Sequence, residues 1–172
     1  RHTISVEIDA RTLREVYLRP FEIAIKQSRP WTVMAAYNRI NGVYACSHQQ
    51  LLMDVLKSEW AFEGLVISDW FAAKETVANA LGGLDLEMPG GPGIVWGERL
   101  LEAVGEGLVP ESIVDDKVRR LLRVIDWSWR FDEPDEQPER ALDTPEHRSL
   151  AYRAACEGMV LIKNNGVLPL SA

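Results

Sequence analysis

Three short apolar runs alternate with helical patterns between residues 32 and 125, and each run becomes polar where it ends. The polar ends are Tyr37-Asn38, Ser68-Asp69-Trp70 and Glu87. Apolar strands separated by amphipathic helices are typical of parallel β-α units whose sheet is covered on both faces. In such sheets ligands bind at the carboxyl ends of the strands. The pattern therefore predicts an α/β fold in which these polar residues gather at one edge.

Hydrophobic periodicity and turn residues set the expected elements. Strands are expected at 32–37, 65–67 and 84–87, and helices at 11–26, after Ser47, at 72–81, 95–106 and 113–125. Pro20 should interrupt the first helix, because proline removes a backbone donor. Ser47 and Gln50 have the spacing of a capping box at the start of the second helix. The last helix should bury its apolar positions, which are Val114, Val118, Leu121, Leu122 and Ile125.

The composition changes after Trp129, where an acidic, proline-containing stretch begins. A closed eight-stranded barrel takes roughly 250 residues. Only three of its strands can be recognised in the sequence before this stretch. We therefore expect residues 1–129 to be the later part of a TIM-like (β/α)8 barrel. Residues 130–157 should be a linker and a helix capped by Thr144-Pro145. Residues 158–172 should begin an α/β sandwich domain, with Met159–Ile162 as its first strand.

Composition excludes several classes of function. The chain has 172 residues, 47% of them hydrophobic. Its net charge of -7 and the absence of a stripe of basic residues argue against a nucleic-acid partner. No apolar run is long enough to suggest a membrane segment or an export signal. Cys46 and Cys156 lack the spacing of a zinc site, and no histidine has a ligand partner three or four residues away. We expect no metal and no cofactor.

Asp69 has two interpretations from the pattern alone. It could cap the helix that follows it, or it could act as a nucleophile, a base or a ligand at the mouth of the barrel. Trp70 could cover the rim or pack against the C–H face of a sugar ring. Tyr37 could be a core tyrosine or a phenol that orients a nearby carboxylate. Asp85 and Glu87 are expected to be structural, with backbone or arginine partners.

Taken together, six segments resemble the family 3 glycoside hydrolases, in particular the β-glucosidase branch. They are "TISVEIDARTLREVYLRPFE", "VMAAYNRINGVYACSH", "GLVISDW", "GLDLEMPGG", "EGLVPESIVDDKVRRLLRV" and "GMVLIKNNGVLPL". The resemblance covers nearly the whole chain except the linker. It implies a barrel-like N-terminal domain, a linker and an α/β sandwich domain, with the active site between the two domains.

The resemblance also implies roles for four residues. Asp69 matches the nucleophile that forms a covalent glycosyl-enzyme on a β-glucoside, and Trp70 matches an aromatic residue of the sugar subsites. Tyr37 matches a tyrosine that hydrogen-bonds the nucleophile, and Arg1 occupies the place of a substrate-binding arginine. A retaining mechanism also needs a second carboxyl roughly 5 Å away, which in this family usually comes from the second domain. We therefore expect this chain to need further segments and to hydrolyse little alone.

Three alternatives remain. A β-xylosidase or another β-glycosidase of the same family would share most of these segments. An N-acetylglucosaminidase of the family is disfavoured by Trp70, because that branch tends to have another acid after the nucleophile. A non-catalytic carbohydrate-binding fragment is the alternative from a different class.

Overall fold

The computed structural model describes residues 2–133, 135 and 142–170. Residues 1–134 and 135–172 form two separate compact units. Each unit is described by itself, because their relative position is not determined. Within the described part of the chain, no helix is long and apolar enough to cross a membrane.

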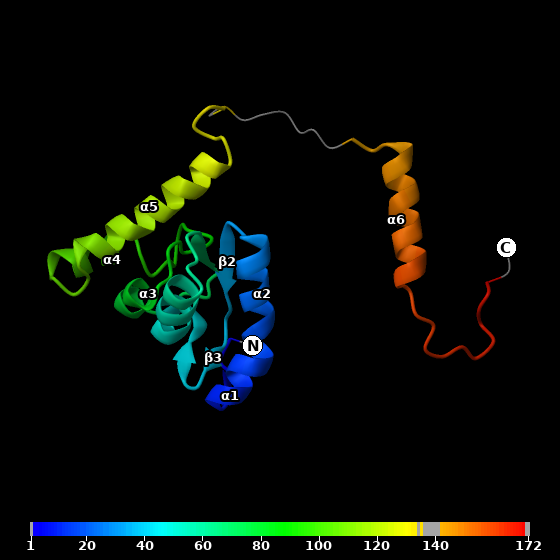
Figure 1. Cartoon of the computed structure of the whole chain (residues 1–172), viewed down its shortest axis with the longest axis horizontal. Helices are drawn as coiled ribbons and strands as arrows, with labels where there is room; N and C mark the ends of the chain where they lie inside the picture. Colours follow the sequence, from blue (N-terminus) through cyan, green and yellow to red (C-terminus); the bar gives the residue numbers. More distant parts are fainter. Residues whose placement is uncertain (1, 134, 136–141, 171–172) are drawn as a thin grey trace. The chain divides into compact units, whose positions relative to one another are not determined.

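The centre of the first unit is a parallel pair of strands (Figure 1). Strand β2 (Thr32–Ala35) pairs with β5 (Leu65–Ser68) in a register that sets Ala35 beside Ser68. Parallel strands require a crossover connection. The chain between β2 and β5 supplies it and includes the helix Gln50–Glu59. Both expected strands are confirmed, and their carboxyl ends lie at the same edge.

The third expected strand, at 84–87, is reduced to a single parallel bridge between Ile67 and Leu86. The backbone hydrogen bonds around this bridge use Val66 and Leu86, but the ladder does not continue beyond them. Met88 donates its N–H to the Ser68 hydroxyl at 2.8 Å, and Pro89 has no N–H to donate. The segment therefore keeps the parallel direction of a strand without the length of one.

A second sheet consists of three strands of two residues each. Strand β1 (Ser5–Val6) pairs in parallel with β3 (Arg39–Ile40), which pairs antiparallel with β4 (Val43–Tyr44). Asn41 and Gly42 form the turn with φ values of 50° and 85°. Asparagine and glycine tolerate this conformation, so they favour a tight hairpin turn. The pairing of β1 with β3 brings the start of the chain beside residues that follow β2.

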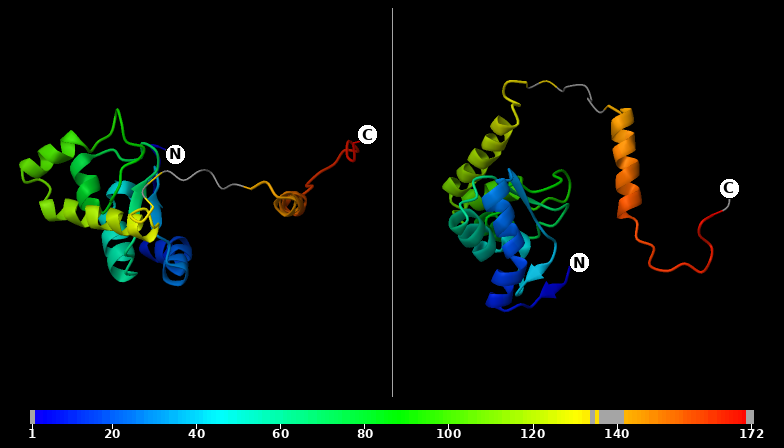
Figure 2. Two further views of the ribbon diagram at one scale, coloured as in Figure 1. Left: turned by 90° about the horizontal axis from the view of Figure 1, so that it is seen from above. Right: turned by 45° about the vertical axis from the view of Figure 1, so that its right-hand side comes forward.

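Eight helical segments surround these strands in the described part of the first unit. They are α1 (Ala10–Thr12), η1 (Leu13–Tyr17), α2 (Arg19–Ser28), η2 (Ala45–Ser47), η3 (Gln50–Glu59), α3 (Thr76–Gly82), α4 (Glu98–Gly105) and α5 (Glu111–Trp127). Pro20 lies in the first turn of α2, so the predicted interruption is confirmed. Figure 2 shows α3, α4 and α5 packed as one group.

Two predicted helix starts are wrong. Ser47 does not cap η3, because its hydroxyl donates to the Asn79 side-chain oxygen at 2.6 Å and η3 begins without a side-chain cap. Helix α3 begins at Thr76 instead of Ala72. Ala72 and Ala73 are buried in irregular chain instead. In both places a tertiary contact overrides the local signal.

The core joins η3 to strand β5. Its buried members come from the helices, the strands and the loops between them, and they include Ile25, Leu52, Val55, Leu56, Trp60, Phe62, Val66 and Leu84. A second cluster of Ala80, Ala103 and Val109 packs α3 against α4. Apolar burial at about 25 cal/mol per Å² makes these contacts the main stabilising term. The core therefore holds β5, and with it the residues that follow β5.

Several apolar side chains are exposed on two helical regions of the first unit. Val118 and Leu122 of α5 are 47% and 45% exposed, whereas Lys117, directly before Val118, is buried. In the first helical region Val16, Tyr17 and Phe21 are all more than half exposed. Periodicity identifies an apolar face but not which of its side chains another element covers, and these five side chains stay exposed in the described part of the chain.

A buried polar network lies at the amino-terminal ends of the strands. Asp85 pairs with the Lys57 ammonium at 2.6 Å and accepts the Val66 N–H at 2.8 Å. The Lys117 ammonium donates to the Leu84 carbonyl at 2.6 Å. Burial lowers the pKa of both lysines, that of Lys117 to about 8, because a desolvated ammonium is disfavoured. The structural interpretation of Asp85 is confirmed, with lysine and backbone partners.

The second unit consists of helix α6 (Pro145–Gly158) and a following extended segment. The Thr144 hydroxyl accepts the His147 N–H at 3.2 Å, which confirms the predicted cap. Asn164 stabilises a turn in the segment after α6, because its side-chain oxygen accepts from the N–H groups of Gly166 and Leu168. The strand predicted at Met159–Ile162 is absent from the described residues, since no neighbouring strand pairs with it there. Ile162 is 93% exposed.

The buried Lys117 predicts a pH dependence of stability. Between its folded pKa of about 8 and the ordinary lysine value of 10.5, the unfolded chain binds more protons than the folded one. Folding stability therefore rises with pH across this window as the buried ammonium loses its charge. Relative to Lys117→Met, the original protein should gain about 2 kcal/mol between pH 7 and pH 10 in denaturant unfolding.

The control for this measurement is Val118→Met on the same helix. It introduces the same side chain at a half-exposed position that carries no titrating group. Its stability difference from the original protein should not change with pH. A Lys117→Met difference that stays constant or reverses between pH 7 and pH 10 would contradict the prediction.

Candidate active site

Asp69 lies immediately after β5, at the edge where β2 also ends. Its N–H donates to the Ala35 carbonyl at 3.0 Å, which ties it to the end of β2. One carboxylate oxygen accepts the Trp70 N–H at 2.7 Å and is thereby oriented. The next helix begins only at Thr76, with Glu75 before it, so Asp69 does not cap it. Of its two predicted interpretations, the helix cap is wrong.

Trp70 presents an exposed indole next to this carboxylate. Its side chain is 53% exposed, so the ring does not serve as a core residue. An exposed aromatic face beside a carboxylate offers both an apolar surface and a charged group to one ligand. The geometry suits a molecule that has an apolar face and a reactive polar atom.

Tyr37 follows β2 by two residues and lies at the same edge as Asp69. The His2 and Tyr37 rings are 4.2 Å apart between centroids, in an edge-on arrangement. This contact brings the start of the chain to the candidate site through the pairing of β1 with β3. Arg1, the fourth predicted site residue, lies outside the described residues. Residue spacing could not have revealed His2, because its contact with Tyr37 depends on that long-range strand pairing.

Glu87 shapes the loop beside Asp69. Its two carboxylate oxygens accept the N–H groups of Val95 and Trp96 at 2.8 and 2.9 Å. The Trp96 indole N–H in turn donates to the Thr76 carbonyl at 3.0 Å. These bonds close the loop 88–97 onto the end of the third strand segment. The structural interpretation of Glu87 is confirmed, and both its oxygens are occupied by backbone donors.

Two buried titratable groups of this part of the fold are structural. Cys46 is fully buried, and its burial, together with the Asp69 and Glu87 carboxylates, raises the pKa of its thiol to about 12. It therefore stays protonated and is not a nucleophile at neutral pH. Burial lowers the pKa of His48 and favours its neutral form. Within residues 2–133, 135 and 142–170, no group of three His, Cys, Asp or Glu side chains could hold a metal ion.

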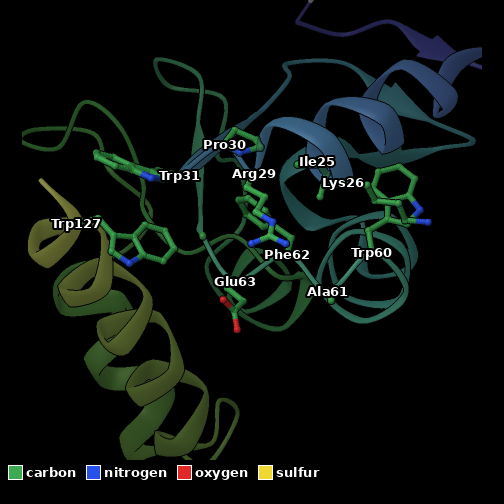
Figure 3. A pocket seen from close by; sticks show the side chains of 11 residues that line it. Ile25, Lys26, Arg29, Pro30, Trp31, Trp60, Ala61, Phe62, Glu63 and Trp127 are labelled. Atoms are coloured by element: carbon green, nitrogen blue, oxygen red, sulfur yellow. The ribbon is translucent and has the colours of Figure 1, made fainter.

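A cavity of about 620 Å³ has a lining that does not include Asp69. Figure 3 shows the side chains that line it. Its lining includes Trp31, just before β2, and Gly64, just before β5, so it opens at the amino-terminal ends of the strands. Trp60, Phe62 and Trp127 add further aromatic walls. In parallel α/β folds this end serves stability and the opposite end serves chemistry. We therefore place the candidate site at Asp69 and not in this cavity.

The role of Glu87 can be tested by removing its carboxylate. Glu87→Ala leaves the Val95 and Trp96 N–H groups without their acceptor, so the loop should loosen. Hydrogen exchange at residues 88–97 should become faster, and unfolding should require about 1–3 kcal/mol less. Glu98→Ala, at an exposed position in the first turn of α4, is the control and should leave this exchange unchanged. Equal exchange in both variants would remove Glu87 from its positioning role.

The chain is similar to known glycoside hydrolases. The model of the family described as "Glycosyl hydrolase family 3 N terminal domain" matches residues 1–124. A β-glucosidase from Rhizobium radiobacter is 46% identical over 171 residues, which is 99% of this chain and 21% of that protein. The thermostable β-glucosidase B of Acetivibrio thermocellus is 45% identical over 99% of this chain and 22% of its own length. The chain thus spans about a fifth of the length of these relatives.

Solved structures give the same relationship. The β-glucosidase 3B of Thermotoga neapolitana, solved with glycerol, superposes with a TM-score of 0.84 at 40% identity over 99% of this chain and 24% of that one. A β-glucosidase from Kluyveromyces marxianus gives a TM-score of 0.83 at 34% identity over 99% of this chain and 21% of its own. The α/β fold is thus that of part of a TIM-like barrel, as predicted. The chain belongs to glycosyl hydrolase family 3, and residues 1–124 belong to its N-terminal domain.

Proposed function

We propose that this chain is part of a retaining β-glucosidase that hydrolyses terminal β-glucosyl residues, with Asp69 as its nucleophile. The observation that carries the proposal is the Asp69-Trp70 pair at the carboxyl end of β5, in a chain 40–46% identical to several β-glucosidases. The position supports it because parallel barrels place their chemistry at the carboxyl ends of strands.

In the proposed mechanism a carboxylate oxygen of Asp69 attacks the anomeric carbon of the bound glucoside. The bond from that carbon to the leaving-group oxygen breaks, and a second carboxyl protonates this oxygen. Water then attacks the same carbon, gives up a proton to the second carboxyl and releases Asp69. The hydrogen bond from the Trp70 N–H to Asp69 supports this role, because it holds the carboxylate in one orientation.

The other site residues have binding roles in this proposal. Trp70 packs its exposed indole against the sugar, and Tyr37 orients Asp69 from the end of β2. Arg1, next to His2 and thus close in sequence to the Tyr37 contact, binds sugar hydroxyls. The second carboxyl comes from outside this chain, since Glu87 is committed to backbone donors. No metal or cofactor enters the reaction.

We also propose a place for the chain within the longer enzyme. Residues 1–129 form the later part of the barrel, 130–157 a linker and helix, and 158–172 the start of the sandwich domain. The exposed apolar side chains on η1, α2 and α5 support this assignment, because neighbouring parts of a closed barrel would cover them. The 172-residue chain expressed alone should therefore show little or no hydrolysis.

The nucleophile can be identified by trapping the covalent intermediate. A 2-fluoro-β-glucoside with a good leaving group should inactivate the full-length enzyme and label the peptide that contains Asp69. Asp69→Asn keeps the shape and the acceptor for the Trp70 N–H but removes the nucleophile. It should lower kcat/KM for β-glucosides by roughly 10⁴-fold or more while unfolding within about 1 kcal/mol of the original protein.

Glu75→Gln provides the matched control, because this exposed carboxylate lies six residues away and before α3. It should retain its activity and its labelling at Asp69. A label on another carboxylate would reject Asp69 as the nucleophile. If β-xylosides are hydrolysed faster than β-glucosides, the enzyme is a β-xylosidase and the proposed substrate is wrong.

A further inference from the structure

Phe71 has a backbone conformation that its neighbours do not explain. Five non-glycine residues of the described chain have positive φ, namely Arg29, Asn41, Ala61, Phe71 and Trp129. Arg29, Ala61 and Trp129 end helices, where a left-handed residue is common, and Asn41 forms the β3–β4 turn. Phe71, at φ 58°, follows a strand and lies five residues before the next helix.

The turn that contains Phe71 normally selects glycine. The Ala72 N–H donates to the Asp69 carbonyl at 3.0 Å and closes a four-residue turn from Asp69 to Ala72. Phe71 is the third residue of this turn, and only it, not Trp70, has positive φ. Type II turns have this arrangement and favour glycine at the third position. A bulky side chain there is an outlier that the surrounding structure must impose.

Two hydrogen bonds impose it. The Phe71 N–H donates to the Met88 carbonyl at 3.0 Å, and the Phe71 carbonyl accepts from the Lys74 ammonium at 2.8 Å. The chain then turns inward, because Ala72 and Ala73 are buried while the Phe71 side chain is 50% exposed. Burial of the ring therefore offsets the strain only in part. The ring is held at the edge where β5 and the third strand segment both end.

We propose that Phe71 is a specificity-determining residue that contacts the leaving group of the substrate. This inference rests on the proposed β-glucosidase function. The ring has no polar atom and cannot select among sugar hydroxyls. It therefore contacts only the apolar surface of a ligand. Phe71 follows Trp70 directly in the turn that begins at Asp69, so two exposed aromatic residues come next to each other in sequence after the proposed nucleophile. The leaving groups it favours are rings with an apolar face, either a second sugar or an aryl group.

The test compares leaving groups in the full-length enzyme. Phe71→Gly suits the turn and removes the ring, whereas Phe71→Tyr keeps a ring. For 4-nitrophenyl β-glucoside and cellobiose, Phe71→Gly should lower kcat/KM by about three- to tenfold, the range expected for one aromatic contact. Methyl β-glucoside, whose leaving group has no ring, should change by less than about twofold. Phe71→Tyr, which keeps the ring, should retain the preference of the original enzyme for ring-shaped leaving groups.

Trp129→Gly is the matched control, since Trp129 is also an exposed aromatic residue at φ 55° but lies beyond the end of α5. It should leave all three kcat/KM values unchanged. If Phe71→Gly lowers the values for all three glucosides equally, Phe71 only supports the turn that positions Asp69, and the inference is overturned. If the original enzyme hydrolyses none of the three, the proposed function itself fails, which is a different outcome.

Discussion

The parallel register of β2 and β5 is the constraint on which the candidate site depends. It sets Ala35 beside Ser68, and the hydrogen bond from the Asp69 N–H to the Ala35 carbonyl extends that register one residue past the strand. Tyr37 and Asp69, 32 positions apart in the sequence, therefore leave the sheet at one edge. A slip of one residue would turn every side chain of β5 to the other face. Such a slip would break the hydrogen bond from the Met88 N–H to the buried Ser68 hydroxyl.

The two ends of these strands carry different kinds of polar chemistry. At the amino-terminal ends, Asp85, Lys57 and Lys117 are buried and hydrogen-bonded to each other or to the backbone. A buried charge is tolerated only with such partners, so this network specifies how the loops and α5 meet β5. At the carboxyl ends, Asp69 and Trp70 remain accessible, and Glu87 and Ser68 organise the neighbouring loop. The separation leaves the candidate site free for a ligand.

Sequence patterns predicted the elements better than their partners. The strands β2 and β5, the break at Pro20 and the cap at Thr144 depend on local preferences and were confirmed. The cap at Ser47 and the burial of Val118 and Leu122 were wrong, because Asn79 takes the Ser47 hydroxyl and α5 buries Lys117 instead. For the site, the sequence indicated Asp69, Trp70 and Tyr37 as polar or aromatic strand ends. It gave no sign of the His2 contact or of the strained turn at Phe71.

The sequence by itself determined the fold class, because alternating apolar strands and amphipathic helices have few solutions other than parallel β-α units. It also predicted the polar strand ends as the candidate site. Its six motifs likewise indicated the family. Only the tertiary structure decided that Asp69 caps no helix, that both oxygens of Glu87 bind the backbone of a loop, and that Phe71 holds an exposed ring in a left-handed turn. These outcomes depend on hydrogen bonds between residues distant in sequence, such as Asp69 to Ala35 and Phe71 to Met88. Local propensity carries no information about partners that only folding brings together.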